Sequence, residues 1–243
     1  MGIIDEVTRT PKPKRAAARP KRRFTWSYSA LHVWETCPRQ YFYNYIEEHP
    51  KPPNVYRDEG IRIHKELETF VKKPRARKAP KDLVLLDNYL KECREQGAES
   101  EVKVCFDREW REVPHGERWG TIVVDLHWLS ARGDYLTVSD LKSGRVRDYS
   151  DQGRIYLAGL IARYPEVIRG HAEFAYSKTG DVLSGEGRPR IVAVDKLEML
   201  GYRRELAVRA GRVEADKTFE AKPGGACRWC DFSRKKGGPC DKG

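Results

Sequence analysis

The chain has 243 residues, of which 34% are charged, and a formal net charge of +11 at pH 7. It contains no run of 18 apolar residues and no apolar signal-peptide core near its start, so we expect a cytoplasmic protein without membrane spans. The length allows one substantial core, and the basic balance favours a polyanionic partner such as nucleic acid.

The first 24 residues are rich in Pro, Arg, Lys and Ala and show no hydrophobic periodicity. They hold eight Lys or Arg against two acidic residues, a net +6 of the total +11, which leaves +5 for the rest. This composition predicts a disordered basic arm, followed by a single domain over residues 25–243. The arm either binds DNA phosphates or is a solvated tail, and its composition does not decide between these roles.

Two short helices are expected after the arm. Ser27 or Ser29 can cap an amphipathic helix. Pro38 suits the first position of a second helix, which includes the aromatic-rich residues 39–45. Cys37 therefore lies at a helix junction. The aromatic side chains are more typical of a core than of a platform that stacks on bases.

A longer helix is predicted where residues 60–70 place apolar side chains at helical spacing, with His64 beside the apolar face. A histidine there is usually partly buried without a ligand, although it can bind a metal or a phosphate. Residues 72–81 hold six basic residues and two prolines, which indicates a loop that can line a path for DNA. A further helix is expected over 82–96, ending at Gly97.

Several β-rich runs follow. Residues 101–107 alternate between polar and apolar side chains, which predicts a strand. Residues 120–129 and 135–142 are separated by a short polar turn that contains Gly133, a pattern typical of a β-hairpin. Beyond the hairpin we expect a helix over 149–163, strands over 171–177 and 191–194, and a charged helix over 195–212.

Three charged side chains of this hairpin can converge at one end of a sheet. Asp140 and Lys142 are two residues apart and so project from the same face, which Asp125 on the partner strand can also reach. Paired carboxylates bind hard cations such as Mg²⁺, which lower the pKa of water and screen a phosphodiester. Lys142 can orient or deprotonate an attacking water. The alternative is an exposed ion pair on an edge strand.

Six cysteines are present, at positions 37, 93, 105, 227, 230 and 240. Those in the helix over 82–96 and the strand over 101–107 are expected to pack in the core. Cys227 and Cys230 form a Cys-x-x-Cys motif in a Gly-rich segment, and Cys240 follows ten residues later. A cytosolic address favours metal ligation over disulfides, with Cys37 as the best fourth ligand. Zinc and an iron–sulfur cluster both accept four thiolates, and the alternative is unligated thiols near a flexible terminus.

Together these residues resemble the RecB-like branch of the PD-(D/E)xK nuclease superfamily. The likeness is greatest to the CRISPR-associated RecB-like exonucleases and their phage relatives with an iron–sulfur cluster, and it covers about residues 26–240. The matching motifs are the opening helix with Cys37-Pro38, Gly60-x-x-x-His64, Asp125, Asp140-Leu-Lys142, Gln152-x-x-x-Tyr156, Cys227-x-x-Cys230 and Cys240.

The resemblance implies an α/β fold, with a mixed central sheet flanked by helices in a restriction-endonuclease-like core. It also implies a divalent-metal-dependent deoxyribonuclease. Asp125, Asp140 and His64 would hold Mg²⁺ or Mn²⁺, the Leu141 carbonyl would be a further ligand, and Lys142 would activate water.

The resemblance also implies roles for the remaining motifs. Gln152 and Tyr156 would contact DNA or support the site. A [4Fe–4S] cluster, with Zn²⁺ as the alternative, would join the N-terminal helices to the C-terminus through four ligands: Cys37, Cys227, Cys230 and Cys240. Exonuclease action on single-stranded DNA ends is the family's common behaviour, and a recombinase, a helicase or a CRISPR integrase would be the protein partner. Two alternatives remain: a non-catalytic DNA-binding subunit with the same fold, and a zinc-stapled RNA or DNA processing factor with a purely structural hairpin.

Overall fold

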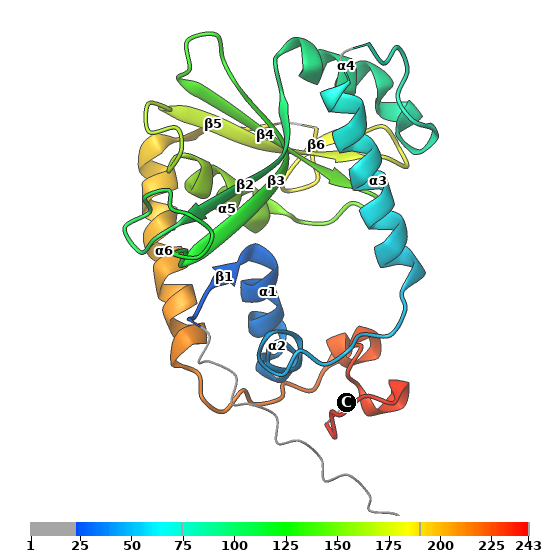
Figure 1. Ribbon diagram of the computed structural model, residues 1–243, viewed down its shortest axis with the longest axis vertical. Coiled ribbons are helices and arrows are strands. Elements are labelled where there is room, and N and C mark those ends of the chain that lie inside the picture. The colour runs from blue at the N-terminus through cyan, green and yellow to red at the C-terminus, as the bar shows by residue number, and fades with distance from the viewer. Residues whose placement is uncertain (1–22, 74, 190, 243) are drawn as a thin grey trace, which may run out of the picture.

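The computed structural model describes residues 23–73, 75–189 and 191–242, and Figure 1 shows how their elements are arranged. All but the last two positions of the basic arm expected over residues 1–24 lie outside the described residues. None of the described helices combines the length and the apolar character needed to cross a membrane.

The α-helices are α1 (Tyr28–Thr36), α2 (Pro38–Tyr41), α3 (Val55–Lys72), α4 (Asp87–Glu95), α5 (Ser150–Leu160) and α6 (Lys196–Ala215). A π-helical turn spans Phe42–Ile46, and 3₁₀ turns span Lys81–Leu86, Gly225–Trp229 and Arg234–Lys236. The strands are β1 (Trp26–Ser27), β2 (Glu99–Phe106), β3 (Gly120–Leu129), β4 (Tyr135–Lys142), β5 (Arg169–Tyr176), β6 (Val182–Ser184) and β7 (Val194–Asp195).

These strands form one mixed sheet centred on β3 and β4. Strand β3 pairs antiparallel with β2 and β4, and parallel with the short β1. Strand β4 runs parallel to β5, so the chain must cross over between them, and α5 lies in that connection. Strands β6 and β7 pair antiparallel with β5. The predicted α/β fold, with a mixed central sheet flanked by helices, is confirmed.

Helices cover both faces of the sheet (Figure 1). One apolar core lies between the sheet and α1, α5 and α6, and the other between the sheet and α3 and α4. In α3 the side chains of Ile63, Leu67 and Phe70 repeat every three or four residues, and all three are buried in the second core. This periodicity explains why the helix was predictable from the sequence.

The hairpin strands β3 and β4 have the predicted limits, and Gly133 in their turn has φ of +74°. The helix expected over 82–96 begins later, because Lys81–Leu86 forms a 3₁₀ turn and only Asp87–Glu95 is α-helical. In a 3₁₀ turn residues three apart point the same way, which buries Leu83 and Leu86 together. The strand expected over 191–194 is reduced to Val194–Asp195.

The lower part of the molecule in Figure 1 brings α1 and α2 together with the C-terminal turns. Tyr43 donates a hydrogen bond to the Pro239 carbonyl at 3.3 Å and packs against Phe232. Arg39 donates to the Phe219 carbonyl at 2.9 Å. The two ends of the described chain are therefore packed against each other, in line with the aromatic side chains being core.

An ion-pair network joins this lower part to α5. The Arg209 guanidinium on α6 donates to Glu35 on α1 at 2.7 Å and to Asp151 on α5 at 2.8 Å. Because one planar side chain binds two carboxylates, it fixes three helices relative to one another.

The close packing of α5 on the sheet predicts the effect of one substitution. A Cβ atom at Gly159 would lie 2.6 Å from Ile122 Cδ1. Gly159→Val should therefore lower the free energy of unfolding by about 1–3 kcal/mol, measured by urea denaturation. The control Gly211→Ala on α6, where an added Cβ meets nothing within 4 Å, should leave stability unchanged or raise it. Equal stability of Gly159→Val and the wild type would contradict this packing.

Candidate active site

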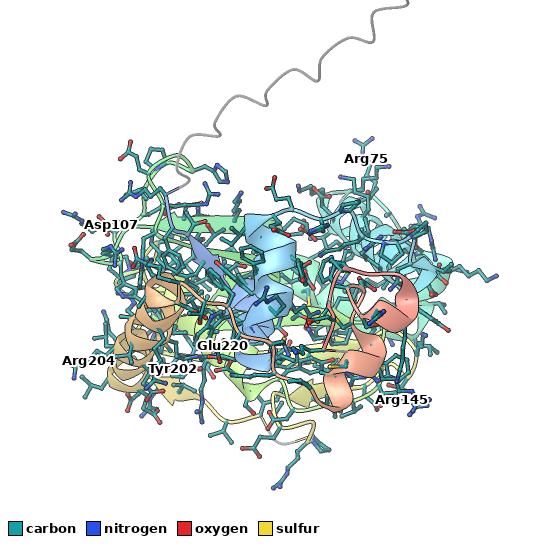
Figure 2. The ribbon with its side chains drawn as sticks, turned by 90° about the horizontal axis from the view of Figure 1, so that it is seen from below. Arg75, Asp107, Arg145, Tyr202, Arg204 and Glu220 are labelled. Carbon is teal, nitrogen blue, oxygen red and sulfur yellow. The ribbon has the colours of Figure 1, made fainter. Side chains whose placement is uncertain are left out.

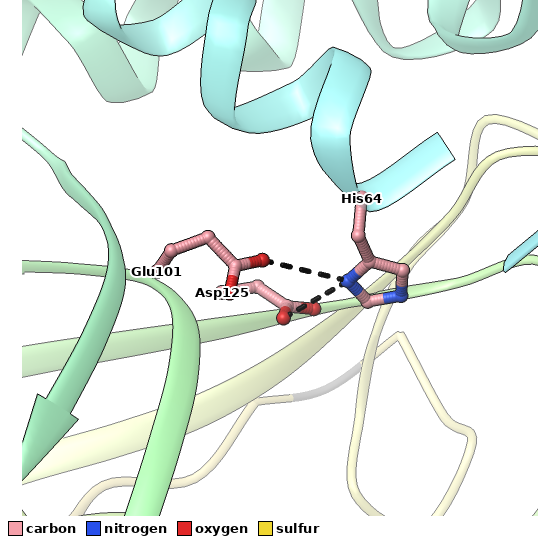
Figure 3. Close-up of side chains that lie close together, drawn as sticks. All are labelled: His64, Glu101 and Asp125. Atoms are coloured by element: carbon pink, nitrogen blue, oxygen red, sulfur yellow. Dashed lines mark hydrogen bonds and ion pairs between the residues drawn. The ribbon is translucent and has the colours of Figure 1, made fainter. Parts of the chain in front are cut away.

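Three side chains from three elements converge beside α3 (Figure 3). His64 extends from α3, Glu101 from β2 and Asp125 from β3, and their ligand atoms all lie within 4.8 Å of one another. His64 Nδ1 is 3.0 Å from Asp125 Oδ1 and 4.0 Å from Glu101 Oε1. An imidazole nitrogen with two carboxylates is a donor set that suits a divalent cation.

A local irregularity of the sheet directs Asp125 toward α3. On a regular strand Val124 and Leu126 would face the same side. Here Val124 lies in the core on the α5 side, and Leu126 lies in the core on the α3 side. On the neighbouring strand Glu101 has φ of +54°, a strained value for a residue other than glycine. The strain falls where two acidic side chains meet His64.

Asp125 nevertheless stays close to the end of β4. Its Oδ2 atom accepts a hydrogen bond from the Leu141 amide at 2.7 Å. Asp125 points to His64, whereas Asp140 and Lys142 are hydrogen-bonded to side chains of α5. The charge of Asp125 is nevertheless close enough to raise the pKa of Asp140, and the convergence of the three side chains on one site stays a prediction. Asp140 does not belong to the group of three potential metal ligands.

Asp140 and Lys142 are held by α5. Asp140 Oδ1 accepts hydrogen bonds from Gln152 Nε2 at 2.9 Å and from the Tyr156 hydroxyl at 2.8 Å. Lys142 Nζ lies 2.6 Å from Asp140 Oδ2 and donates to Gln152 Oε1 at 2.8 Å. Gln152 and Tyr156 are four residues apart, so they share one face of the helix and can bind the same carboxylate. Both are buried, which favours support of the site over contact with DNA.

The electrostatics of the site favour a bound cation. Burial raises the pKa of Asp140 to about 6, and the nearby charge of Asp125 adds to the shift against the opposing effect of Lys142. Burial and Asp125 also raise the pKa of Glu101. Burial is the largest single effect on His64 and lowers its pKa, but the hydrogen bond to Asp125 and the charges of Asp125, Asp140 and Glu101 together give a net upward shift. A divalent cation would relieve this crowding of negative charge, so the residues fit Mg²⁺ or Mn²⁺.

Sequence reasoning missed Glu101. It lies 24 residues before Asp125, and the ladder of β2 and β3 brings it there by pairing Val102 with Val124 and Ser100 with Leu126. The available signal was its place in a predicted strand that precedes the hairpin. Leu141 presents its amide to Asp125, and a role for its carbonyl as a ligand stays a prediction.

The four cysteines expected to act together line a single cavity: Cys37, Cys227, Cys230 and Cys240. The pKa of the Cys230 thiol is raised by burial and then by the charges of the other three. The Lys222 amide donates to the Cys37 sulfur, and the Gly224 amide to the Cys227 sulfur, each at 3.4 Å. The four thiols thus lie between the α1–α2 junction and the C-terminal turns.

The two remaining cysteines have no part in this cavity. Cys93 is buried in the core under α3 and α4, where burial raises the pKa of its thiol to about 12. Cys105 is buried on β2, with its sulfur 3.6 Å from the Thr121 hydroxyl. Both positions agree with a packing role.

The family model of the PD-(D/E)XK nuclease superfamily matches residues 25–234. The chain belongs to this superfamily, and its mixed sheet flanked by helices is the restriction-endonuclease-like core. Membership supports a metal-dependent nuclease that acts on DNA. No curated protein matches the sequence.

Two solved structures are similar to this chain. The protein SSO0001 is 15% identical, with a TM-score of 0.46 over 93% of this chain and 90% of that one. A candidate exonuclease from Eubacterium rectale is 14% identical, with a TM-score of 0.47 over 87% of each chain. The family assignment rests on the family model and not on these structures.

The charge of the site predicts how metal affects stability. Folded Asp140 keeps its proton up to about pH 6, whereas its ordinary pKa is 3.8. Because the folded state then binds more protons than the unfolded state, this group's contribution to stability is lost as pH rises through that window. Mn²⁺ should therefore raise the Tm more at pH 8 than at pH 5, where protons compete with the metal.

Differential scanning fluorimetry of three proteins provides the test. The Asp125→Asn variant should lose most of the Mn²⁺-induced shift at pH 8. The Asp58→Asn variant, altered at an exposed position of α3, should keep it. An equal shift in Asp125→Asn and the wild type would show that the metal binds elsewhere.

Proposed function

We propose that the protein is a divalent-metal-dependent deoxyribonuclease that acts as an exonuclease on single-stranded DNA ends. The observation that carries the proposal is that the Leu141 amide, between Asp140 and Lys142, donates to Asp125 of the His64–Glu101–Asp125 group in a member of a nuclease superfamily. A net charge of +11 adds long-range attraction for a polyanion.

In this proposal Asp125, Asp140 and His64 would hold Mg²⁺ or Mn²⁺, and the Leu141 carbonyl would be a further ligand. The geometry adds Glu101 to this set, because its carboxylate faces His64 and Asp125. When bound, the cation supplies Lewis acidity that lowers the pKa of water and offsets the charge of a phosphodiester.

Lys142 is the group that acts on the attacking water. Its ammonium is fixed by Asp140 and Gln152, and it lies 4.1 Å from the centre of the Tyr149 ring. A cation held in this way orients the water, assists its deprotonation and stabilises negative charge that develops on the phosphate. Hydrogen bonds with Gln152 and Tyr156 hold the side chains of Asp140 and Lys142 in fixed positions relative to each other.

Basic side chains on the surface supply contacts to the DNA backbone. Figure 2 shows Arg75 and Arg145 pointing outward from the rim, on the side where the C-terminal turns lie. Both are exposed, and Arg75 belongs to the basic segment 72–81. Contacts of this kind release counterions and bind DNA without regard to its sequence.

The four grouped cysteines, at positions 37, 227, 230 and 240, are proposed to hold a [4Fe–4S] cluster in a structural role. The support is that all four cysteines line one cavity, together with the resemblance to relatives that hold such a cluster. Zinc, which also accepts four thiolates, is the alternative. Amide donors to two of the sulfurs would stabilise the thiolates.

We place this activity in phage or CRISPR DNA processing or recombination. A recombinase, a helicase or a CRISPR integrase would be the partner. The support is the order of the sequence motifs, which resembles the CRISPR-associated RecB-like exonucleases.

Asp140→Asn keeps the size of the side chain but removes the charge. Cleavage of end-labelled single-stranded DNA with Mg²⁺ or Mn²⁺ should fall by about 100-fold or more, whereas DNA binding is retained. Asp134→Asn, in the turn of the same hairpin, is the matched control and should cleave normally. Near-normal cleavage by Asp140→Asn or Lys142→Ala would remove the proposed active site.

Protein purified without oxygen should be yellow-brown, with absorbance near about 400 nm from thiolate-bound iron. Alanine at any one of the four grouped cysteines (37, 227, 230 or 240) should bleach the colour and lower the solubility. Cys93→Ala and Cys105→Ala serve as controls and should stay coloured. A colourless protein that contains one zinc would reject the cluster but keep the link between the chain ends.

A further inference from the structure

One face of α3 leads directly to the potential metal ligands. Tyr56, Gly60 and His64 are four residues apart and therefore lie on the same side of the helix. Tyr56 is 82% exposed, and a side chain at Gly60 would meet nothing within 4 Å. Along about 12 Å of helix, this face presents an aromatic ring, a bare stretch of backbone and the imidazole.

These residues line one open depression together with Arg57, Ile61, Lys65, Glu68, Glu101 and Asp125. The depression thus contains apolar surface from Tyr56 and from Ile61, which is 64% exposed. It also contains two basic side chains, of which Lys65 pairs with Glu68 at 2.6 Å. Its far end is the group of His64 and the two carboxylates.

We propose that this depression is a subsite for a nucleotide of single-stranded DNA, in which Tyr56 stacks on a base and Gly60 leaves room for it. The inference rests on the proposed function, because a phosphate at the metal ligands fixes where the neighbouring nucleotide lies. Exposed aromatic rings beside basic residues are the usual platform for single strands. Within a duplex the base faces are covered by stacking, so Tyr56 could reach only the outer face of a terminal base pair.

Gly60 is consistent with this assignment. An added Cβ at Gly60 would meet nothing within 4 Å, so the helix surface one turn before His64 is open to a bound group.

Binding of a single-stranded oligodeoxynucleotide that carries 2-aminopurine near its end tests the role of Tyr56 without any need for cleavage. Tyr56→Ala should weaken binding about 5- to 150-fold and abolish the fluorescence quenching caused by stacking. Tyr56→Phe should retain both. The dependence of affinity on salt should not change, because stacking releases no counterions. Val55→Ala, at the neighbouring exposed residue outside the depression, is the control and should bind normally.

Gly60→Leu tests whether the open space above Gly60 is needed for the nucleotide to bind. It should weaken single-strand binding or raise the KM by about tenfold or more, while the Mn²⁺-induced shift in Tm is retained. Gly211→Leu on α6, where a side chain also meets open space, should change neither property. Unchanged single-strand binding in both Tyr56→Ala and Gly60→Leu would overturn the inference. Absence of cleavage by the wild type would instead overturn the proposed function, so the two failures are distinct.

Discussion

The carboxylate of Asp125 is the contact on which the arrangement of the site depends. It is buried, accepts a hydrogen bond from the Leu141 amide at 2.7 Å and lies 3.0 Å from His64 Nδ1. One side chain thus ties β3 to β4 beyond the pairing of Leu126 with Ser139 and anchors α3 to the sheet. Burying a charge costs free energy unless the charge is paired or bound to a metal. The carboxylate that orders the site therefore also favours the binding of a cation there.

A second set of contacts reaches the site from the opposite face. Asp140 and Lys142 are fixed by Gln152 on α5, and the residue before it, Asp151, is bound by Arg209. Arg209 also binds Glu35, two residues before Cys37 in the cysteine group. These ion pairs, together with neighbouring positions along the chain, connect the cysteine group with the helix that supports Asp140.

The sequence allowed prediction of features that depend on local patterns. The hairpin limits follow from two β-rich runs around Gly133, and α3 follows from its apolar periodicity. Glu101 and the direction of Asp125 were not predictable, since they depend on the pairing of β2 with β3 and on a φ of +54° at Glu101. Strand pairing and backbone angles leave no trace in spacing or composition, so the only signal for Glu101 was its place in a predicted strand before the hairpin. The 3₁₀ turn before α4 was not predicted, because over six residues the apolar periodicity does not distinguish a 3₁₀ helix from an α-helix.

The position of a bound metal tests the account most directly. Crystals of the full chain soaked in Mn²⁺ and measured for anomalous scattering should show a peak coordinated by Asp125, Asp140 and His64, with Glu101 beside it. The crystallised protein should also cleave DNA in solution with Mn²⁺. A peak located away from these four side chains, or its absence in protein that is active with Mn²⁺, would contradict the assignment of the site.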